Sequence, residues 1–161
     1  MDFSIKNYIE EHSKILEKIN IQDLQEVIDL IYDAHIKEKK IITCGNGGSA
    51  STASHMITDW NKMTMNYTSK KLYGFSLTDN IGLITAYAND TNYENVFKGQ
   101  LESIMDSGDF LISISGSGNS KNVINAINYA KSIGGHTISI VGFDGGELKK
   151  ISDKCVHVPS F

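Results

Sequence analysis

The sequence predicts an α/β fold in which a parallel sheet is covered by helices on both faces. Three observations lead to this fold class. Five short apolar runs recur along the chain, helix-forming segments separate them, and a pair of amphipathic helices precedes the first run. With 161 residues, of which 40% are hydrophobic, the chain is long enough for one well-buried domain and too short for two large ones. We therefore expect a single domain spanning residues 1–161.

Residues 1–40 are predicted to form the helical pair, because their apolar side chains recur at helical spacing. Ile15 and Ile19 belong to the first apolar stripe, and Leu24 begins the second. The break between the helices, with the N-cap of the second, is expected at residues 21–23. A helical pair ahead of an α/β unit must bury its apolar stripe against the domain or against another subunit. We assign these helices to packing and oligomerisation.

Residues 41–161 are predicted to form the α/β core. The expected strands are Ile41–Cys44, Leu72–Leu77, Phe110–Ile114, Thr137–Val141 and Cys155–Val158. The expected helices are Ser49–Asn61, Asn80–Tyr87, Tyr93–Ile104 and Asn119–Ile133. Such alternation of strands and helices is typical of a parallel sheet. The polar segment Lys62–Lys71 is predicted to be mobile or to lie at a subunit boundary.

Two loops rich in glycine and serine, Gly45–Ser49 and Ser115–Ser120, each follow a predicted strand directly. Exposed amides at a helix N-terminus and the aligned peptide dipoles favour a bound anion, and glycine lets the backbone approach it closely. Either loop alone is equally compatible with an ordinary strand-to-helix turn. Because the two loops are separated by a βαβ spacing, together they indicate anion binding at the carboxyl edge of the sheet.

Other polar residues are candidates for chemistry. His55 and Asp59 lie four residues apart on the helix after the first loop, which puts them on one face, about 6 Å apart at Cβ. Such a pair can share a metal ion or form an ordinary surface ion pair, and zinc usually takes at least three protein ligands. Asn89 and Asp90 follow an apolar helical stretch, and they could cap the helix that begins near Tyr93, contact a substrate, or do both.

Composition excludes some classes of partner. The net charge is -4, and all fifteen basic residues are lysines, whereas arginine is the favoured reader of phosphate backbones and guanine edges. The chain has neither a signal-like N-terminus nor an apolar run of membrane-spanning length. We therefore expect neither nucleic acid nor a membrane as a partner, and a cytoplasmic location. A dinucleotide site is disfavoured, because Asp79 comes too late after Gly45 and Gly47 to bind a ribose.

The motifs together resemble the SIS (sugar isomerase) domain family. They follow one another in its order: Gly45–Ala50, His55, Asp59, Asn89–Asp90 and Ser115–Ser120. Within the family the chain is most similar to the phosphoheptose isomerases, which interconvert sedoheptulose 7-phosphate and D-glycero-D-manno-heptose 7-phosphate. The resemblance implies a flavodoxin-like α/β/α sandwich with a five-stranded parallel sheet. It also implies a homotetramer with active sites at subunit interfaces.

The resemblance further implies roles for individual residues. The residues that would bind a sugar phosphate are Asn46, Gly47, Gly48, Ser49, Asn89, Asp90, Ser115, Gly116, Ser117 and Ser120. Within this set, the serine loop would hold the phosphate. His55 takes the place of a zinc ligand, with one zinc ion expected per subunit. Asp59 takes the place of the acid that binds zinc and is proposed to move the proton.

Three departures from the family pattern bear on function. Asp59 stands where the family has Glu, so its carboxylate reaches about 1.5 Å less far. Gly116 stands where the isomerases usually have Thr, which removes one hydroxyl donor. The family also continues into a C-terminal helix with a Gln and a His that complete the metal site, and we expect this chain to lack that helix.

The resemblance implies an aldose–ketose isomerisation through an enediol, within bacterial heptose synthesis for lipopolysaccharide or capsule. The alternative is a non-catalytic SIS module that binds a sugar phosphate or a protein, similar to the regulator that associates with the bacterial replication initiator. The departures at Asp59 and at the C-terminal helix favour this alternative, whereas the His55/Asp59 pair favours the enzyme.

Overall fold

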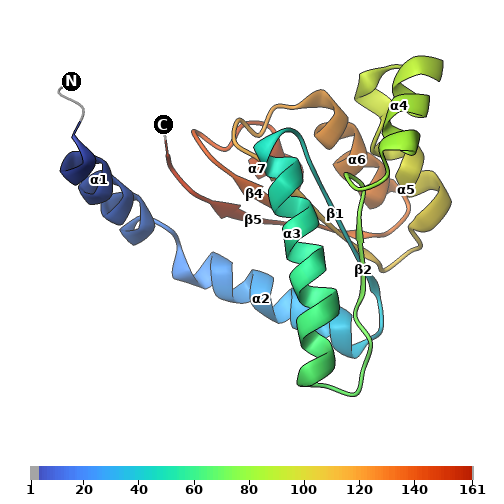
Figure 1. Cartoon of the computed structure of the whole chain (residues 1–161), viewed down its shortest axis with the longest axis horizontal. Helices are drawn as coiled ribbons and strands as arrows, with labels where there is room; N and C mark the ends of the chain where they lie inside the picture. Colours follow the sequence, from blue (N-terminus) through green and yellow to red (C-terminus); the bar gives the residue numbers. More distant parts are fainter. Residues whose placement is uncertain (1–3, 161) are drawn as a thin grey trace.

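The computed structural model describes residues 4–160, which contain a five-stranded sheet. The strand order is β2-β1-β3-β4-β5, and every pairing is parallel. The strands are β1 (Lys40–Gly45), β2 (Tyr73–Ser76), β3 (Phe110–Ser115), β4 (His136–Val141) and β5 (Lys154–His157). Helices flank the sheet on both sides (Figure 1). The predicted α/β/α sandwich with five parallel strands is therefore confirmed.

Seven α-helices and two short 3-10 helices connect the strands in the described part of the chain. The α-helices are α1 (Ile5–Glu17), α2 (Ile21–Ile36), α3 (Gly48–Met63), α4 (Ile81–Asp90), α5 (Lys98–Ile104), α6 (Lys121–Ser132) and α7 (Leu148–Ile151). The 3-10 helices are η1 (Thr64–Asn66) and η2 (Tyr93–Asn95). The helices α3 and α6 follow β1 and β3 directly, so their N-termini lie at the carboxyl edge of the sheet.

Two hydrophobic cores lie on the two faces of the sheet. Successive strand residues point to opposite faces, so Ile41 packs in the core beneath α2 while Ile42 packs in the core beneath α5 and α6. Leu111 and Ile112 divide between the cores in the same way. Full burial of each such side chain contributes roughly 1.5–3 kcal/mol. This two-sided burial explains why the central strands β1 and β3 show no alternation of buried and exposed residues, whereas the edge strand β2 alternates.

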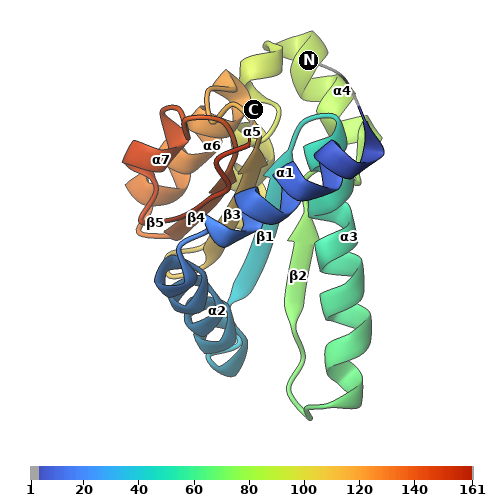
Figure 2. The same cartoon turned by 90° about the vertical axis from the view of Figure 1, so that its left-hand side faces the viewer.

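Helix α1 stands apart from the sheet, at the N-terminal end of α2 (Figures 1 and 2). None of its described residues is buried. Its apolar residues Ile5, Tyr8, Ile9 and Leu16 are 55–74% exposed. In the described chain, no helix has the length and apolar content that crossing a membrane requires. Because Ile5, Tyr8, Ile9 and Leu16 are exposed, the apolar stripe that they form on α1 faces solvent in the isolated chain.

Local details differ from the sequence prediction in three places. The N-cap of α2 is Asn20, whose Oδ1 accepts from the backbone N–H groups of Gln22 and Asp23, so the break lies just before the predicted 21–23. The helix predicted over residues 93–104 is two pieces, η2 and α5, because the chain turns there to bury Val96 and Phe97. The short helix α7 was not predicted.

Candidate functional site

The two glycine- and serine-rich loops lie side by side, because they follow adjacent strands. Strand β1 pairs with β3 in a register that places Gly45 opposite Ile114. A Cβ on Gly45 would lie 2.8 Å from the carbonyl oxygen of Ser49 and 2.9 Å from that of Ile114. Only glycine fits between these backbones, so the first loop approaches the end of β3 closely. The structure thus brings both predicted loops to one edge of the sheet.

The first loop presents backbone donors to open space. Gly47 has φ +55°, a conformation that favours glycine, and Gly48 is the first residue of α3. A Cβ on either residue would meet nothing within 4 Å. Among the described residues, neither backbone N–H has a hydrogen-bond partner, whereas that of Ser49 donates to the Asn46 carbonyl at 3.0 Å. Two amides at the start of a sixteen-residue helix are therefore available to a ligand oxygen.

Asn46 belongs to a hydrogen-bond cluster that the sequence did not reveal. Its side-chain amide exchanges two 2.9 Å bonds with the amide of Asn122 on α6, and its Oδ1 accepts from the Tyr93 hydroxyl at 3.0 Å. Asn122 is only 3% exposed. The sequence held one sign of it: Asn122 is a polar residue on the helix face that also carries the buried Val123 and Ala126 of α6.

The serine loop presents hydroxyl donors. Ser115 Oγ accepts from the N–H of Gly118, and Ser117 Oγ accepts from the N–H of Asn119, each at 3.2 Å. Neither bond uses the hydroxyl proton, and because Ser115 is only 5% exposed, the half-buried Ser117 is the more open of the two to a ligand. Ser120 is the N-cap of α6, and its side chain makes no capping bond. These hydroxyls surround the N-terminus of a twelve-residue helix, a combination suited to phosphate.

The shape of the serine loop depends on one glycine. Gly118 has φ +64°, and a Cβ there would lie 2.0 Å from the carbonyl oxygen of Gly145 in the turn after β4. Its own carbonyl accepts from the N–H of Leu148 at 2.9 Å. A Cβ on Gly116, in contrast, would meet nothing within 4 Å. The loop therefore has space at Gly116 for the threonine that the sequence lacks.

His55 and Asp59 lie together on α3, with Nε2 and Oδ2 3.2 Å apart. The side chains are 75% and 51% exposed, so the pair faces solvent. Two ligands of one tetrahedral zinc ion lie about 3.4 Å apart when each bond is about 2.1 Å, so this separation suits a shared metal. Within residues 4–160, no group of three or more His, Cys, Asp and Glu side chains gathers around one point. The described residues therefore fit part of a zinc site.

Asn89 and Asp90 do not cap the following helix, which excludes one of the two roles considered for them, while contact with a substrate stays a prediction. Both belong to the last turn of α4, where Asn89 Nδ2 donates to Asp90 Oδ1 at 2.9 Å. The N-cap of η2 is Asn92. The apolar stretch before them simply continues the helix through Asp90, because no glycine or proline stops it. Both side chains are exposed, and within the described chain no hydrogen bond joins them to either loop.

Cys44 lies beneath the first loop but does not contribute a reactive thiol. It is fully buried at the end of β1, and burial raises the pKa of its thiol to about 12. Burial also raises the pKa of Cys155 in β5. Both thiols are therefore neutral near pH 7, which argues against either as a nucleophile.

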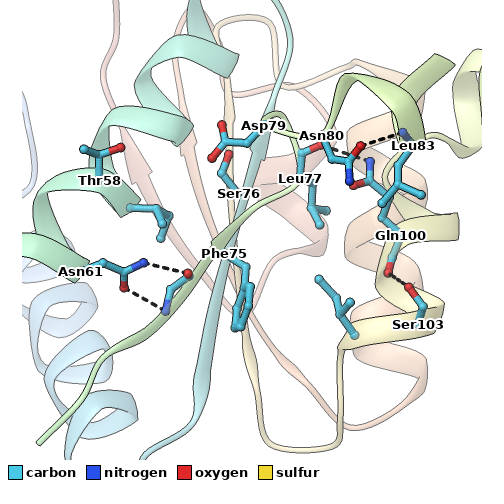
Figure 3. A pocket seen from close by; sticks show the side chains of 13 residues that line it. Thr58, Asn61, Phe75, Ser76, Leu77, Asp79, Asn80, Leu83, Gln100 and Ser103 are labelled. Carbon is cyan, nitrogen blue, oxygen red and sulfur yellow. Dashed lines mark hydrogen bonds between the residues drawn. The ribbon is translucent and has the colours of Figure 1, made fainter.

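A cavity of about 410 Å³ lies beside the edge strand β2, between α3, α4 and α5 (Figure 3). Asn61 on α3 turns toward this edge, where its amide donates to the Gly74 carbonyl at 3.0 Å and accepts from the Gly74 N–H at 3.1 Å. One side chain thus satisfies the outward-facing backbone groups of the strand edge. None of the predicted site residues lines this cavity, so it is separate from the two loops.

Comparison with known proteins agrees with this arrangement. The model of the SIS domain matches residues 7–142. The chain is 41% identical to the probable phosphoheptose isomerase of Thermoplasma acidophilum, over 96% of this chain and 85% of that protein. It is 41% identical to a phosphoheptose isomerase of Helicobacter pylori, over 99% and 84% of the two chains. The solved phosphoheptose isomerase of Neisseria gonorrhoeae superposes with a TM-score of 0.85 at 30% identity, covering 98% of this chain and 88% of that one.

Proposed function

Because this chain belongs to the SIS domain family, we propose that it is a phosphoheptose isomerase that converts sedoheptulose 7-phosphate to D-glycero-D-manno-heptose 7-phosphate. The observation that carries the proposal is the meeting of two donor-rich loops at the ends of β1 and β3. One offers backbone amides at the start of α3, the helix that carries the His55 imidazole and the Asp59 carboxylate about two turns further on, and the other offers serine hydroxyls at a helix N-terminus. A phosphorylated sugar needs both kinds of contact.

The chemistry divides between the two loops. Ser115, Ser117 and Ser120 bind the phosphate, far from the reacting carbons, and this binding energy orients the sugar. The amides of the first loop bind oxygens at the carbonyl end. Asp59 takes the proton from the carbon next to the carbonyl and returns it to the neighbouring carbon. An enediol forms between these two steps, as the carbonyl oxygen gains a proton, and the hydroxyl oxygen on the neighbouring carbon then loses one to become the aldehyde. The products feed bacterial heptose synthesis.

His55 and Asp59 would hold a zinc ion together with ligands from outside the described residues. When bound, zinc supplies Lewis-acid polarisation of the two adjacent substrate oxygens. The 3.2 Å separation of His55 Nε2 and Asp59 Oδ2 supports this assignment. The zinc content of the purified protein tests it directly.

Self-association is part of the proposal. The exposed apolar stripe of α1 supports an oligomer, which we propose to be a tetramer, because a helix of this kind is stable when its stripe is buried against a partner. We propose a cytoplasmic location for the enzyme.

The alternative is a non-catalytic sugar-phosphate-binding module. The observation that favours it is the incomplete set of metal ligands among residues 4–160. Both candidates bind sugar phosphate through the serine loop, so binding alone does not distinguish them. Turnover of the sugar phosphate and the metal content of the protein distinguish the enzyme from the binding module.

The test is chromatographic assay of the purified protein with sedoheptulose 7-phosphate and zinc, alongside elemental analysis. The isomerase proposal predicts an aldose heptose 7-phosphate product and bound zinc. His55→Ala is expected to lose the zinc and at least 100-fold in kcat, whereas His136→Ala, at the exposed first residue of β4 and thus at the opposite edge of the sheet, keeps both. Binding of the sugar phosphate without product or zinc would instead support the non-catalytic module.

A further inference from the structure

We propose that Asn122 and Tyr93 are positioning residues that hold the Asn46 amide with only an N–H donor available to the substrate. This inference rests on the proposed function, since it assigns how the first loop contacts the sugar. Its structural basis is a hydrogen-bond cluster that joins three elements: the half-buried turn after β1, the exposed Tyr93 of the 3-10 helix η2 and the buried Asn122 of α6. None of the sequence motifs includes Asn122 or Tyr93.

The backbone of α6 determines which way both amides face. The N–H of Val123 is shared between the Ser120 carbonyl and Asn122 Oδ1, each at 3.0 Å, and a backbone N–H can only donate. An amide nitrogen in this place would set N–H groups against that donor, so the facing atom of Asn122 is its oxygen. It also lies 2.9 Å from Asn46 Nδ2, so the facing atom of Asn46 must be its nitrogen. The reciprocal 2.9 Å bond then runs from Asn122 Nδ2 to Asn46 Oδ1.

Tyr93 completes the orientation of Asn46. Its hydroxyl donates to Asn46 Oδ1 at 3.0 Å, so this oxygen accepts two hydrogen bonds. Both of its lone pairs are then in use. One N–H of Nδ2 is bonded to Asn122, and the other has no partner among the described residues. For a ligand, the Asn46 side chain is thus a single N–H donor.

This orientation has a chemical consequence for the proposed isomerisation. The sugar oxygens near the reacting carbons gain negative charge as the enediol forms. A fixed N–H donor stabilises such an oxygen, whereas an amide carbonyl in its place would repel it. Asn122 is 3% exposed and tied to the backbone of α6, so it resists the rotation that would exchange the two amide atoms. Positioning of Asn46 therefore acts on kcat more than on substrate binding.

Two variants test the proposal by removing different numbers of hydrogen bonds to Asn46. Asn122→Leu keeps a similar volume but removes both bonds to Asn46, and we expect kcat to fall about 10- to 100-fold. Tyr93→Phe removes one bond at an exposed side chain, and we expect about a threefold to tenfold fall. KM for sedoheptulose 7-phosphate should stay within about twofold in both, because the serine loop is unchanged.

Matched controls separate positioning from general damage. Asn128→Leu changes the same residue type at an exposed position of α6. Tyr87→Phe removes a tyrosine hydroxyl that donates to the Gly99 carbonyl at 2.8 Å, away from Asn46. Both controls should keep the kcat of the unmodified protein. If the two positioning variants match their controls, the proposal is wrong.

A crystal structure of Asn122→Leu gives a readout that does not need activity. We expect the Asn46 amide to rotate or leave its place once its partner is gone. An unchanged Asn46 amide would overturn the inference, even where the unmodified protein isomerises sedoheptulose 7-phosphate. If the unmodified protein does not turn over sedoheptulose 7-phosphate, the proposed function is wrong. The crystal structure of Asn122→Leu would still show whether Asn122 holds the Asn46 amide.

Discussion

Asp59 is the residue on which the proposed proton transfer depends. Its carboxylate projects from α3 and is half exposed, with His55 as its neighbour at 3.2 Å. Because neither side chain is buried, their mutual attraction contributes little to folding. Loss of the carboxylate should therefore lower the catalytic rate but hardly change the free energy of unfolding.

We predict that Asp59→Asn lowers kcat at least about 100-fold, since an amide cannot accept the proton. The thermal midpoint should shift by no more than about 2 °C, because an exposed surface substitution usually changes stability within ±0.5 kcal/mol. Steady-state kinetics and calorimetry measure both quantities. Glu102→Gln, at an exposed carboxylate on α5, is the control and should keep full activity. An active Asp59→Asn enzyme would remove Asp59 from the mechanism.

At the scale of elements, the strands could be predicted because two-sided burial leaves a continuous apolar run in the sequence. The boundary between η2 and α5 could not, because it depends on Val96 and Phe97 reaching the core. The capping role considered for Asn89 is excluded for a similar reason, since residues that suit a cap can also end a helix. Asn122 shows the limit most clearly, because its partner Asn46 is 76 residues away in the chain.

The turn between α7 and β5 contains a carboxylate that anchors strand β4. Asp153 Oδ2 accepts from both the backbone N–H and the hydroxyl of Thr137, each at 2.8 Å. Partial burial opposes ionisation of Asp153, but these bonds and the nearby Lys131 outweigh it and lower its pKa below the usual 3.8. A lowered folded-state pKa means that the ionised group stabilises the fold above about pH 4.

We predict that this contribution disappears as the pH falls below 3.8 through the lowered pKa of Asp153. Asp153→Asn should therefore unfold at a lower temperature than the unmodified protein at pH 7. The difference between their thermal midpoints should shrink as the pH falls below 3.8 and the Asp153 carboxylate takes up its proton. Differential scanning calorimetry across this range measures it. A difference that stays constant with pH would show that ionisation of Asp153 does not stabilise β4.

At the scale of the whole molecule, α1 is the element whose position the isolated chain explains least. Its residues Ile5 and Leu16 are 74% and 63% exposed, and none of its described residues is buried. A contiguous apolar surface of this kind marks a protein–protein contact more often than a free surface. Partner chains would then bury the stripe.

We predict that Ile9→Glu, which places a charge in the α1 stripe, lowers the molar mass of the particle in solution. Light scattering coupled to size-exclusion chromatography measures this mass. Lys14→Glu changes the charge on the polar side of the same helix and should leave the mass unchanged. Equal masses for the two variants and the unmodified protein would exclude α1 from the interface.

The central claim is that the two loops together support proton transfer on a sugar phosphate. The most direct measurement is NMR and mass spectrometry of sedoheptulose 7-phosphate incubated with the protein and zinc in deuterated water. We predict an aldose heptose 7-phosphate that carries deuterium at C2, because the proton passes through a base that exchanges with solvent. Recovery of bound but unchanged ketose, without deuterium at C1, would contradict the account.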